Sequence, residues 1–207
     1  MPKDTRLMGY ADDTAATIAV RDLEQAHGPS LAIQKTEIVI LTTKRIDVEI
    51  PIQVGTEEVQ AQKVAKHLGI LLDNKLTFWE HIKRAADKAC TVTTNLSRLM
   101  ANVGGPKSSR RRLLISVTHC ILLYGAEVWA DAVKIEKYRK RMAGIQGRGA
   151  QLVACAYRTV SEPAALLIAE VMPIDLLTAE RKVAYVKINE CGKFEAKREA
   201  RAQAIQK

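Results

Sequence analysis

The sequence predicts an α+β protein in which short strands come first and long helices follow. Two observations predict this class. Before residue 76 the apolar runs are short and rich in β-branched residues, whereas after it apolar residues recur at helical spacing with few breakers. Hydrophobic residues make up 47% of the chain, which is enough to build a core and excludes wholesale disorder.

The amino-terminal segment is predicted to form strands separated by turn residues. Alternating apolar residues within 46–54 are typical of a half-buried strand, and Gly28-Pro29, Gly55 and Asp73-Asn74 are typical of turns. The expected strands are 17–20, 37–42, 46–54 and 67–72, with one very short helix at 21–26.

The carboxyl-terminal segment is predicted to be a helical bundle. A first helix at 78–102 should end at Gly104-Gly105-Pro106, and a second should start after a Ser108-Ser109 cap and run to about 132. A third covers 135–157, and Pro163 suits the first turn of a fourth. The tail, 176–207, is helix-prone but becomes highly charged from Lys193, so we expect it to fray. The expected domain boundaries are 1–75, 76–160 and 161–207.

The positive charge of the chain is concentrated in one block. The whole chain has 32 Lys and Arg against 23 Asp and Glu, a net of +9. Residues 82–148 alone have 14 basic and 4 acidic residues, a net of +10, which leaves 18 against 19 elsewhere. A solvated helical face is the alternative, but such a face usually mixes its charges, so a nucleic acid is the favoured partner. The predicted contact residues are Arg110, Arg111, Arg112, Lys137, Arg139, Lys140 and Arg141.

Several functional classes are excluded by simpler features. The four cysteines lie 30, 35 and 36 positions apart, a spacing that favours reduced thiols over a zinc site or a disulfide framework. No apolar stretch reaches the roughly 18 residues of a membrane-spanning helix, and residues 1–9 lack the apolar core of a signal peptide. We therefore expect an intracellular protein, nuclear or cytoplasmic and not secreted, with no membrane partner and no evident small-molecule cofactor.

Adjacent carboxylates at Asp12 and Asp13 form the strongest candidate for chemistry. They follow Tyr10 and Ala11, and two neighbouring carboxylates repel each other unless a cation neutralises them. In the tight turn of a hairpin both could face one site, and Mg²⁺ prefers such oxygen ligands together with substrate phosphates. An exposed turn with no special role is the alternative for the dipeptide alone.

Tyr10-Ala11-Asp12-Asp13 resembles the Y/F-A-D-D box of reverse transcriptases, and the following segments agree with that family in order. Residues 28–37 resemble its next motif, G-L-x-L-x-x-x-K-T-E, and residues 67–73 resemble its primer grip, Y-L-G-V-x-L-D. Residues 122–129 and 156–161 are similar to the thumb and connection of non-LTR retrotransposon polymerases. The resemblance is strongest to insect elements that insert at fixed sites such as ribosomal DNA.

The resemblance implies a partial polymerase palm followed by a mostly helical thumb and connection. It implies Mg²⁺ bound by Asp12 with support from Asp13, and an RNA template paired with a DNA primer as the substrate duplex. Tyr10 and Ala11 would line the nucleotide and primer site, and Leu68 and Gly69 would lie at the primer grip. The resemblance further implies that Lys35 protonates the leaving group, although a solvated lysine at the start of a strand is an equal alternative.

Departures from the family pattern lead us to expect that the chain alone is inactive. The family supplies a further metal-binding carboxylate from a strand upstream of its A-D-D box, and no residue before Tyr10 matches it. Only 21 residues separate Asp13 from Lys35, where relatives carry a longer helical insert. We expect no fingers and upstream palm segment joined in frame. The alternative function is a non-enzymatic remnant that binds nucleic acid.

Overall fold

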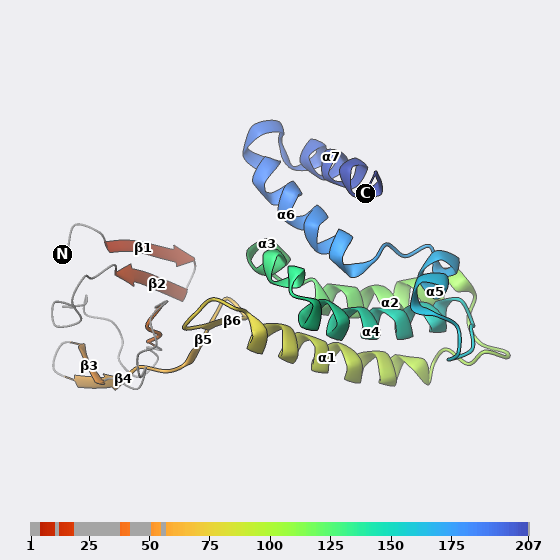
Figure 1. Ribbon diagram of the computed structural model, residues 1–207, viewed down its shortest axis with the longest axis horizontal. Helices are drawn as coiled ribbons and strands as arrows, with labels where there is room; N and C mark the ends of the chain where they lie inside the picture. Colours follow the sequence, from red (N-terminus) through yellow and green to blue (C-terminus); the bar gives the residue numbers. More distant parts are fainter. Residues whose placement is uncertain (1–4, 11–12, 19–37, 42–50, 55–56, 207) are drawn as a thin grey trace. The chain divides into compact units, whose positions relative to one another are not determined.

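The computed structural model describes residues 5–10, 13–18, 38–41, 51–54 and 57–206 (Figure 1). The chain divides into two compact units, residues 1–80 and 81–207. Strands occur in the first unit and helices dominate the second, which confirms the α+β class. A further boundary at residue 161 stays a prediction.

The described strands of the first unit pair as three antiparallel hairpins. Their register places Tyr10 opposite Asp13, Ile52 opposite Val59, and Ala65 opposite Leu72. The strands are β1 Thr5–Tyr10, β2 Asp13–Ile18, β3 Pro51–Val54, β4 Glu57–Gln60, β5 Val64–His67 and β6 Ile70–Asp73. The expected helix at 21–26 and the first part of the expected strand at 46–54 lie outside the described residues. The strand expected at 37–42 is wrong over its described part, 38–41, where only an isolated bridge joins Val39 to Gln62.

The single strand expected at 67–72 is wrong, because this segment turns back on itself. His67 ends β5 and pairs with Ile70, the first residue of β6. Leu68 and Gly69 form the two-residue connection, with φ of 46° and 82°. Positive φ at both central positions is the type I′ geometry that suits the twist of a tight hairpin, and the glycine accepts it without steric cost.

The first long helix, α1 Trp79–Ser97, begins at a carboxylate cap. The two carboxylate oxygens of Asp73 accept hydrogen bonds from the backbone N–H of Thr77 (2.9 Å) and of Phe78 (2.7 Å). The Thr77 hydroxyl donates a further bond to the same carboxylate. Asp73 therefore satisfies donors at the point where the hairpin chain becomes helical.

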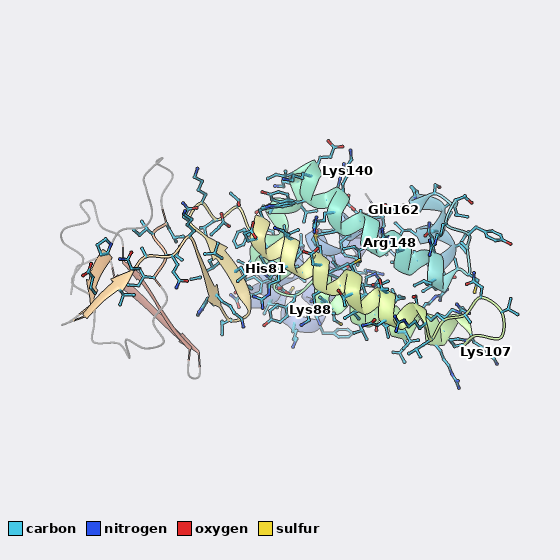
Figure 2. All side chains as sticks on the ribbon, turned by 90° about the horizontal axis from the view of Figure 1, so that it is seen from below. His81, Lys88, Lys107, Lys140, Arg148 and Glu162 are labelled. Carbon is cyan, nitrogen blue, oxygen red and sulfur yellow. The ribbon has the colours of Figure 1, made fainter. Side chains whose placement is uncertain are left out.

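The second unit packs its helices around small and aliphatic side chains. The helices after α1 are α2 Ser108–Leu122, α3 Ala126–Trp129, the 3-10 helix η3 Ala130–Lys134, α4 Glu136–Val153, α5 Glu162–Ala169, α6 Ile174–Cys191 and α7 Lys193–Ile205. Ile115, Val153 and Leu166 bring α2, α4 and α5 into one buried cluster. A buried hydrogen bond of 2.9 Å between the hydroxyls of Thr93 and Thr118 joins α1 to α2. The three long helices α1, α2 and α4 run beside one another (Figures 1 and 2).

Two helical expectations need correction. The helix expected from Ser108 to residue 132 breaks after Leu122, where Gly125 has a left-handed backbone and Trp129 turns back to donate its indole N–H to the Tyr124 carbonyl. The Ser108-Ser109 cap is also wrong: Lys107 occupies the N-cap position and makes no side-chain cap bond. Pro163 does lie in the first turn of α5, as expected.

The charged tail does not fray but folds back as α7 against α6 (Figure 1). Ala196, Ala200 and Ala204 recur every four residues and are buried on this face. Lys187 pairs with Glu199 at 2.6 Å and Arg201 pairs with Glu180 at 2.8 Å, so the charges flank the alanine face. The expectation of fraying is wrong because it weighed the charge of the tail and overlooked the alanines that recur every four residues.

Candidate nucleic-acid interface

The acidic hairpin is described only in part. Tyr10 ends β1 and Asp13 begins β2, and their pairing makes residues 11 and 12 the two-residue connection. Ala11 and Asp12 themselves, like Lys35, lie outside the described residues. The metal site therefore stays a prediction.

The two residues predicted for the primer grip form the turn of the hairpin formed by β5 and β6. Leu68 is 42% exposed, and Gly69 is exposed beside it. The turn is thus at the surface, where its backbone is accessible. Contact with a primer stays a prediction.

The three consecutive arginines have three different environments. Arg111 is buried, with only 2% of its surface exposed. Its guanidinium donates four hydrogen bonds to backbone carbonyls: Pro106 (2.7 Å), Met100 (3.0 Å), Leu152 (3.1 Å) and Ala101. Arg111 therefore holds the carboxyl ends of α1 and α4 to the start of α2, and we remove it from the proposed contact set.

Arg110 and Arg112 are exposed on either side of that buried residue. Arg112 pairs with Glu170 at 2.8 Å, and both side chains are well exposed. Arg110 forms no ion pair or side-chain hydrogen bond with any other described residue. Of the three, Arg110 is the one whose charge is most available to a phosphate.

The predicted cations of α4 are exposed, but they differ in their partners. Lys140 pairs with Glu136 at 2.8 Å, one turn back along the same helix, and Arg141 pairs with Asp87 of α1. Arg139 forms no ion pair among the described residues and lines a cavity described below. Lys137 is exposed at the start of the helix.

Three cations of α1 were missed by the sequence analysis. Lys83, Arg84 and Lys88 are exposed and form no ion pair or side-chain hydrogen bond with the rest of the described chain. Arg84 and Lys88 are four residues apart and share one helix face, while Lys83 lies one turn before Asp87. The sequence already indicated these residues, because the basic block begins at residue 82. They were not selected because the three cations are not consecutive and Asp87 lies among them.

α4 adds cations beside the face of α1 that carries Lys83, whereas Arg84 and Lys88 lie about 100° further round that helix. Arg141 reaches Asp87, and Arg148 donates a hydrogen bond of 3.7 Å to the Cys90 thiol, so both α4 arginines lie against α1. Figure 2 shows Lys88 and Arg148 on these two neighbouring helices. We call Lys83, Arg84 and Lys88 of α1 together with Arg141 and Arg148 of α4 the α1–α4 strip.

Gly144 lies between the two arginines of the α1–α4 strip. A Cβ placed on Gly144 would meet nothing within 4 Å. The strip thus places five cations along two helices, with the carboxylate of Asp87 paired to one of them, Arg141. Such a row can neutralise successive phosphates.

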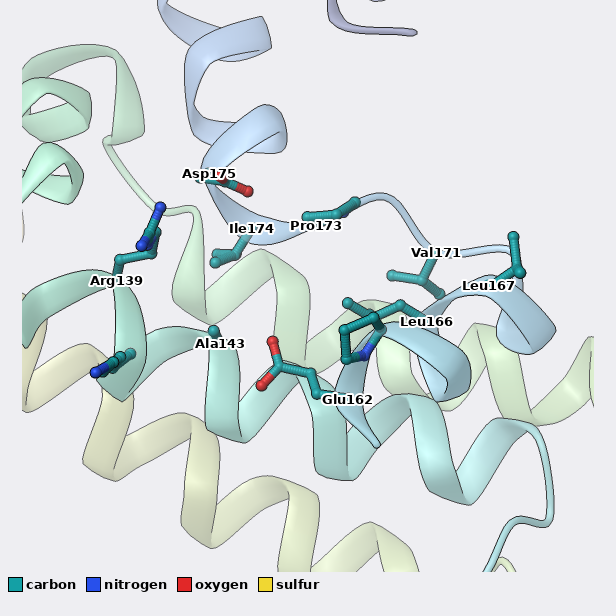
Figure 3. Close-up of a pocket in the computed structure, with 11 residues that line it drawn as sticks. Arg139, Ala143, Glu162, Leu166, Leu167, Val171, Pro173, Ile174 and Asp175 are labelled. Carbon is teal, nitrogen blue, oxygen red and sulfur yellow. The ribbon is translucent and has the colours of Figure 1, made fainter. Parts of the chain in front are cut away.

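A cavity of about 510 Å³ lies elsewhere in the helical unit, where α4 meets α5 and the start of α6 (Figure 3). Its walls include Leu166, Val171 and Ile174, and its charged groups include Arg139 and Glu162. Figure 3 places Arg139 and Glu162 at different parts of its edge. The mixed charge of this cavity suits a polyanion less well than the α1–α4 strip does.

Two histidines belong to the core and not to a site. The His81 ring is tilted by 52° against the Trp129 ring, with centroids 5.9 Å apart, and burial lowers the pKa of His81 although a hydrogen bond to the Tyr124 backbone opposes the shift. Burial also lowers the pKa of His119. The Nε2 atom of His119 is buried and has no hydrogen-bond partner among the described residues. Both side chains are therefore favoured in the neutral form.

Within the described part of the chain, no group of three His, Cys, Asp or Glu side chains is arranged to hold a metal ion. Of the described helices, none taken singly has both the length and the apolar character to cross a membrane; α2 followed by residues 126–134 reaches that composition only as a pair bent by 55°.

Comparison with known proteins identifies a distant relative. No model of a known protein family matches the chain, and no solved structure matches it. The chain is 30% identical over 129 residues to a probable RNA-directed DNA polymerase from transposon BS of Drosophila melanogaster. The match covers 60% of this chain and 14% of that protein. This similarity supports a reverse-transcriptase-like origin for the chain.

Proposed function

We propose that the chain is part of an RNA-directed DNA polymerase of a non-LTR retrotransposon, related to the insect elements that insert at ribosomal DNA. Its helical unit would act as a thumb that binds the duplex of RNA template and DNA primer. The observation that carries the proposal is the α1–α4 strip, whose α1 cations are exposed and form no ion pair with described residues.

The α1–α4 strip fits a phosphate backbone better than it fits an acidic protein. Its members are Lys and Arg spaced along two neighbouring helices, without the aromatic or aliphatic anchors that concentrate binding energy in protein interfaces. Binding through such a strip is insensitive to sequence and strongly dependent on salt. Both properties suit a polymerase that must follow its duplex along any template.

The proposed catalytic roles rest on the motif resemblance. Asp12 would bind Mg²⁺ with support from Asp13, Tyr10 and Ala11 would line the nucleotide site, and Lys35 would serve as the proton donor. When bound, Mg²⁺ would neutralise these carboxylates and orient substrate phosphates. Two carboxylates are an incomplete ligand set for a pair of ions, so no chemical step is assigned to the metal.

Binding to an RNA–DNA duplex tests the proposed function. The whole chain is titrated with a fluorescent duplex at several salt concentrations, beside the variant Lys83→Ala/Arg84→Ala/Lys88→Ala. A matched control removes three exposed cations from outside the basic block, Lys193→Ala/Lys197→Ala/Arg198→Ala.

We expect the α1 variant to bind more weakly and with a shallower salt dependence, and the α7 control to bind like the wild type. Absence of salt-dependent binding, or equal losses in the two variants, would overturn the proposal. Primer extension with Mg²⁺ is measured in parallel. Extension that disappears in Asp12→Asn would overturn the expectation that the chain alone is inactive, and binding without extension would leave nucleic-acid binding as the function of the chain.

A further inference from the structure

The loop that joins α1 to α2 projects beyond the end of the helical unit (Figure 1). We define the tip as residues 98–107. Val103 within it is 92% exposed, and Leu99 at its start is 63% exposed. Figure 2 shows Lys107 at the same end of the helical unit. The tip thus presents apolar side chains at the outermost part of a strongly basic unit.

The tip is held in one shape by Arg111. That guanidinium donates to the carbonyls of Met100 and Ala101 at one base of the loop and to that of Pro106 at the other. Gly105 lies so close that a Cβ there would clash with the Ala101 carbonyl and approach the same guanidinium. A loop tied at both bases is preorganised, so it loses little conformational entropy when it makes a contact.

The charged residues of the tip and of the start of α2 are all basic, and one of them, Arg112, is paired with Glu170. Residues 98–112 contain five Lys and Arg and no acidic residue. Arg98, Lys107 and Arg110 are exposed and form no side-chain ion pair or hydrogen bond with any residue that the structure describes. The first turn of α2 has no acidic residue and no side-chain cap bond, although its amino end carries the positive end of the helix dipole. This arrangement disfavours the isolated helix and favours an anion at that end.

We propose that the tip inserts Val103 into the minor groove of an A-form-like RNA–DNA duplex while Arg98, Lys107 and Arg110 contact the flanking phosphates. The inference rests on the proposed function, that the helical unit binds a nucleic-acid duplex, and adds where and how the groove is contacted. The minor groove of A-form helices is wide and shallow, so a short branched side chain on a projecting loop can reach base edges and sugars. The narrower minor groove of B-form DNA admits such a loop less well.

An anionic lipid surface is the other partner that a basic, apolar tip could meet. Interfacial anchors are usually rich in Trp and Tyr, and residues 98–113 contain no aromatic residue. We therefore favour the duplex and treat vesicle binding as an outcome of the test.

The test compares Val103→Ser with the matched control Val186→Ser, which removes an exposed valine of α6. Affinities of the whole chain are measured for an RNA–DNA duplex, a B-form DNA duplex, a single strand and vesicles of phosphatidylserine and phosphatidylcholine. Thermal unfolding verifies that both variants fold, as expected for side chains so exposed.

We expect Val103→Ser to weaken binding to the RNA–DNA duplex about 3–10-fold with an unchanged salt slope, and to affect B-form DNA and the single strand less. Lys107→Ala/Arg110→Ala should lower the salt slope by about 2. Duplex binding that depends on the α1–α4 strip but not on Val103 would overturn this inference and leave the proposed function intact. A wild-type chain that binds no duplex would overturn both, and a loss confined to vesicles would replace the duplex with a membrane.

Discussion

Replacing Arg111 should lower the free energy of unfolding of the helical unit, whereas replacing Arg110 or Arg112 should change it little. The informative change is Arg111→Met, which removes the guanidinium but keeps an unbranched side chain of comparable reach. Arg110→Met and Arg112→Met are the matched controls, because the three substitutions remove the same group from consecutive positions of one helix.

The expected cost follows from the four carbonyls that Arg111 binds. The Met100 carbonyl belongs to a residue only 1% exposed and cannot turn to water, so leaving it unpaired costs about 1–3 kcal/mol. The other three bonds lie in part-buried surroundings, where water can replace some of the loss, at about 0.5–1 kcal/mol each. Together these losses amount to a destabilisation of about 2.5–6 kcal/mol.

The controls should cost far less. Arg112 forms an exposed pair with Glu170, worth at most about 1 kcal/mol. Arg110 has no bond to lose within the described chain, and its removal should change the free energy of unfolding by less than about 0.5 kcal/mol. Urea unfolding followed by far-ultraviolet circular dichroism measures all three. An Arg111→Met variant as stable as Arg110→Met, but with weaker duplex binding, would refute the assignment and return Arg111 to the contact set.

Two further predictions concern the core. Because burial lowers the pKa values of His81 and His119 in the folded chain, the unfolded chain binds more protons below about pH 6.5. The free energy of unfolding should therefore fall as pH drops below that value, by at most about 1.4 kcal/mol per pH unit for each ring. The variant His119→Gln should reduce this dependence on pH. Equal stability of the wild type at pH 7.5 and 5.5 in urea titrations would contradict the prediction. In α4, Gly144→Ala should stabilise the chain by about 0.5–1 kcal/mol, because the added Cβ would meet no atom within 4 Å. Gly147→Ala should destabilise it by about 1–2 kcal/mol, because the added Cβ would lie 2.8 Å from the Glu162 Cγ. Melting temperatures that move together would show that the two sites are not distinguished by packing.

The helices were predictable where periodicity was sustained and missed where a single tertiary contact decided the outcome. The start of the first helix, α4 and the Pro163 start of α5 follow local pattern, but α1 ends at Ser97, before the expected stop at Gly104-Gly105-Pro106. The break after Leu122 depends on Trp129 returning to the Tyr124 carbonyl, a contact that no local pattern encodes. The hairpin at Leu68 and Gly69 was hidden because an apolar run continues through the turn.

The candidate site shows the same division. The charge count singled out the block that contains the proposed contact residues, but it could not rank them. Arg110 and Arg111 are adjacent and of the same residue type. Only the three-dimensional packing leaves Arg110 exposed and buries Arg111 in a structural role. Lys83 and Arg84 were overlooked because Asp87 interrupts their stretch of the sequence, yet in the structure Asp87 faces Arg141.

The central claim is that the cations of α1 and α4 bind nucleic-acid phosphates. Its most direct test is the slope of log affinity against log salt for an RNA–DNA duplex, measured between about 50 and 200 mM for the wild type and Lys83→Ala/Arg84→Ala/Lys88→Ala. We predict that the slope becomes shallower by about 2–3 in this variant, close to 0.9 for each phosphate that the chain no longer neutralises, and is unchanged in the α7 control. An unchanged slope in the α1 variant would contradict the claim.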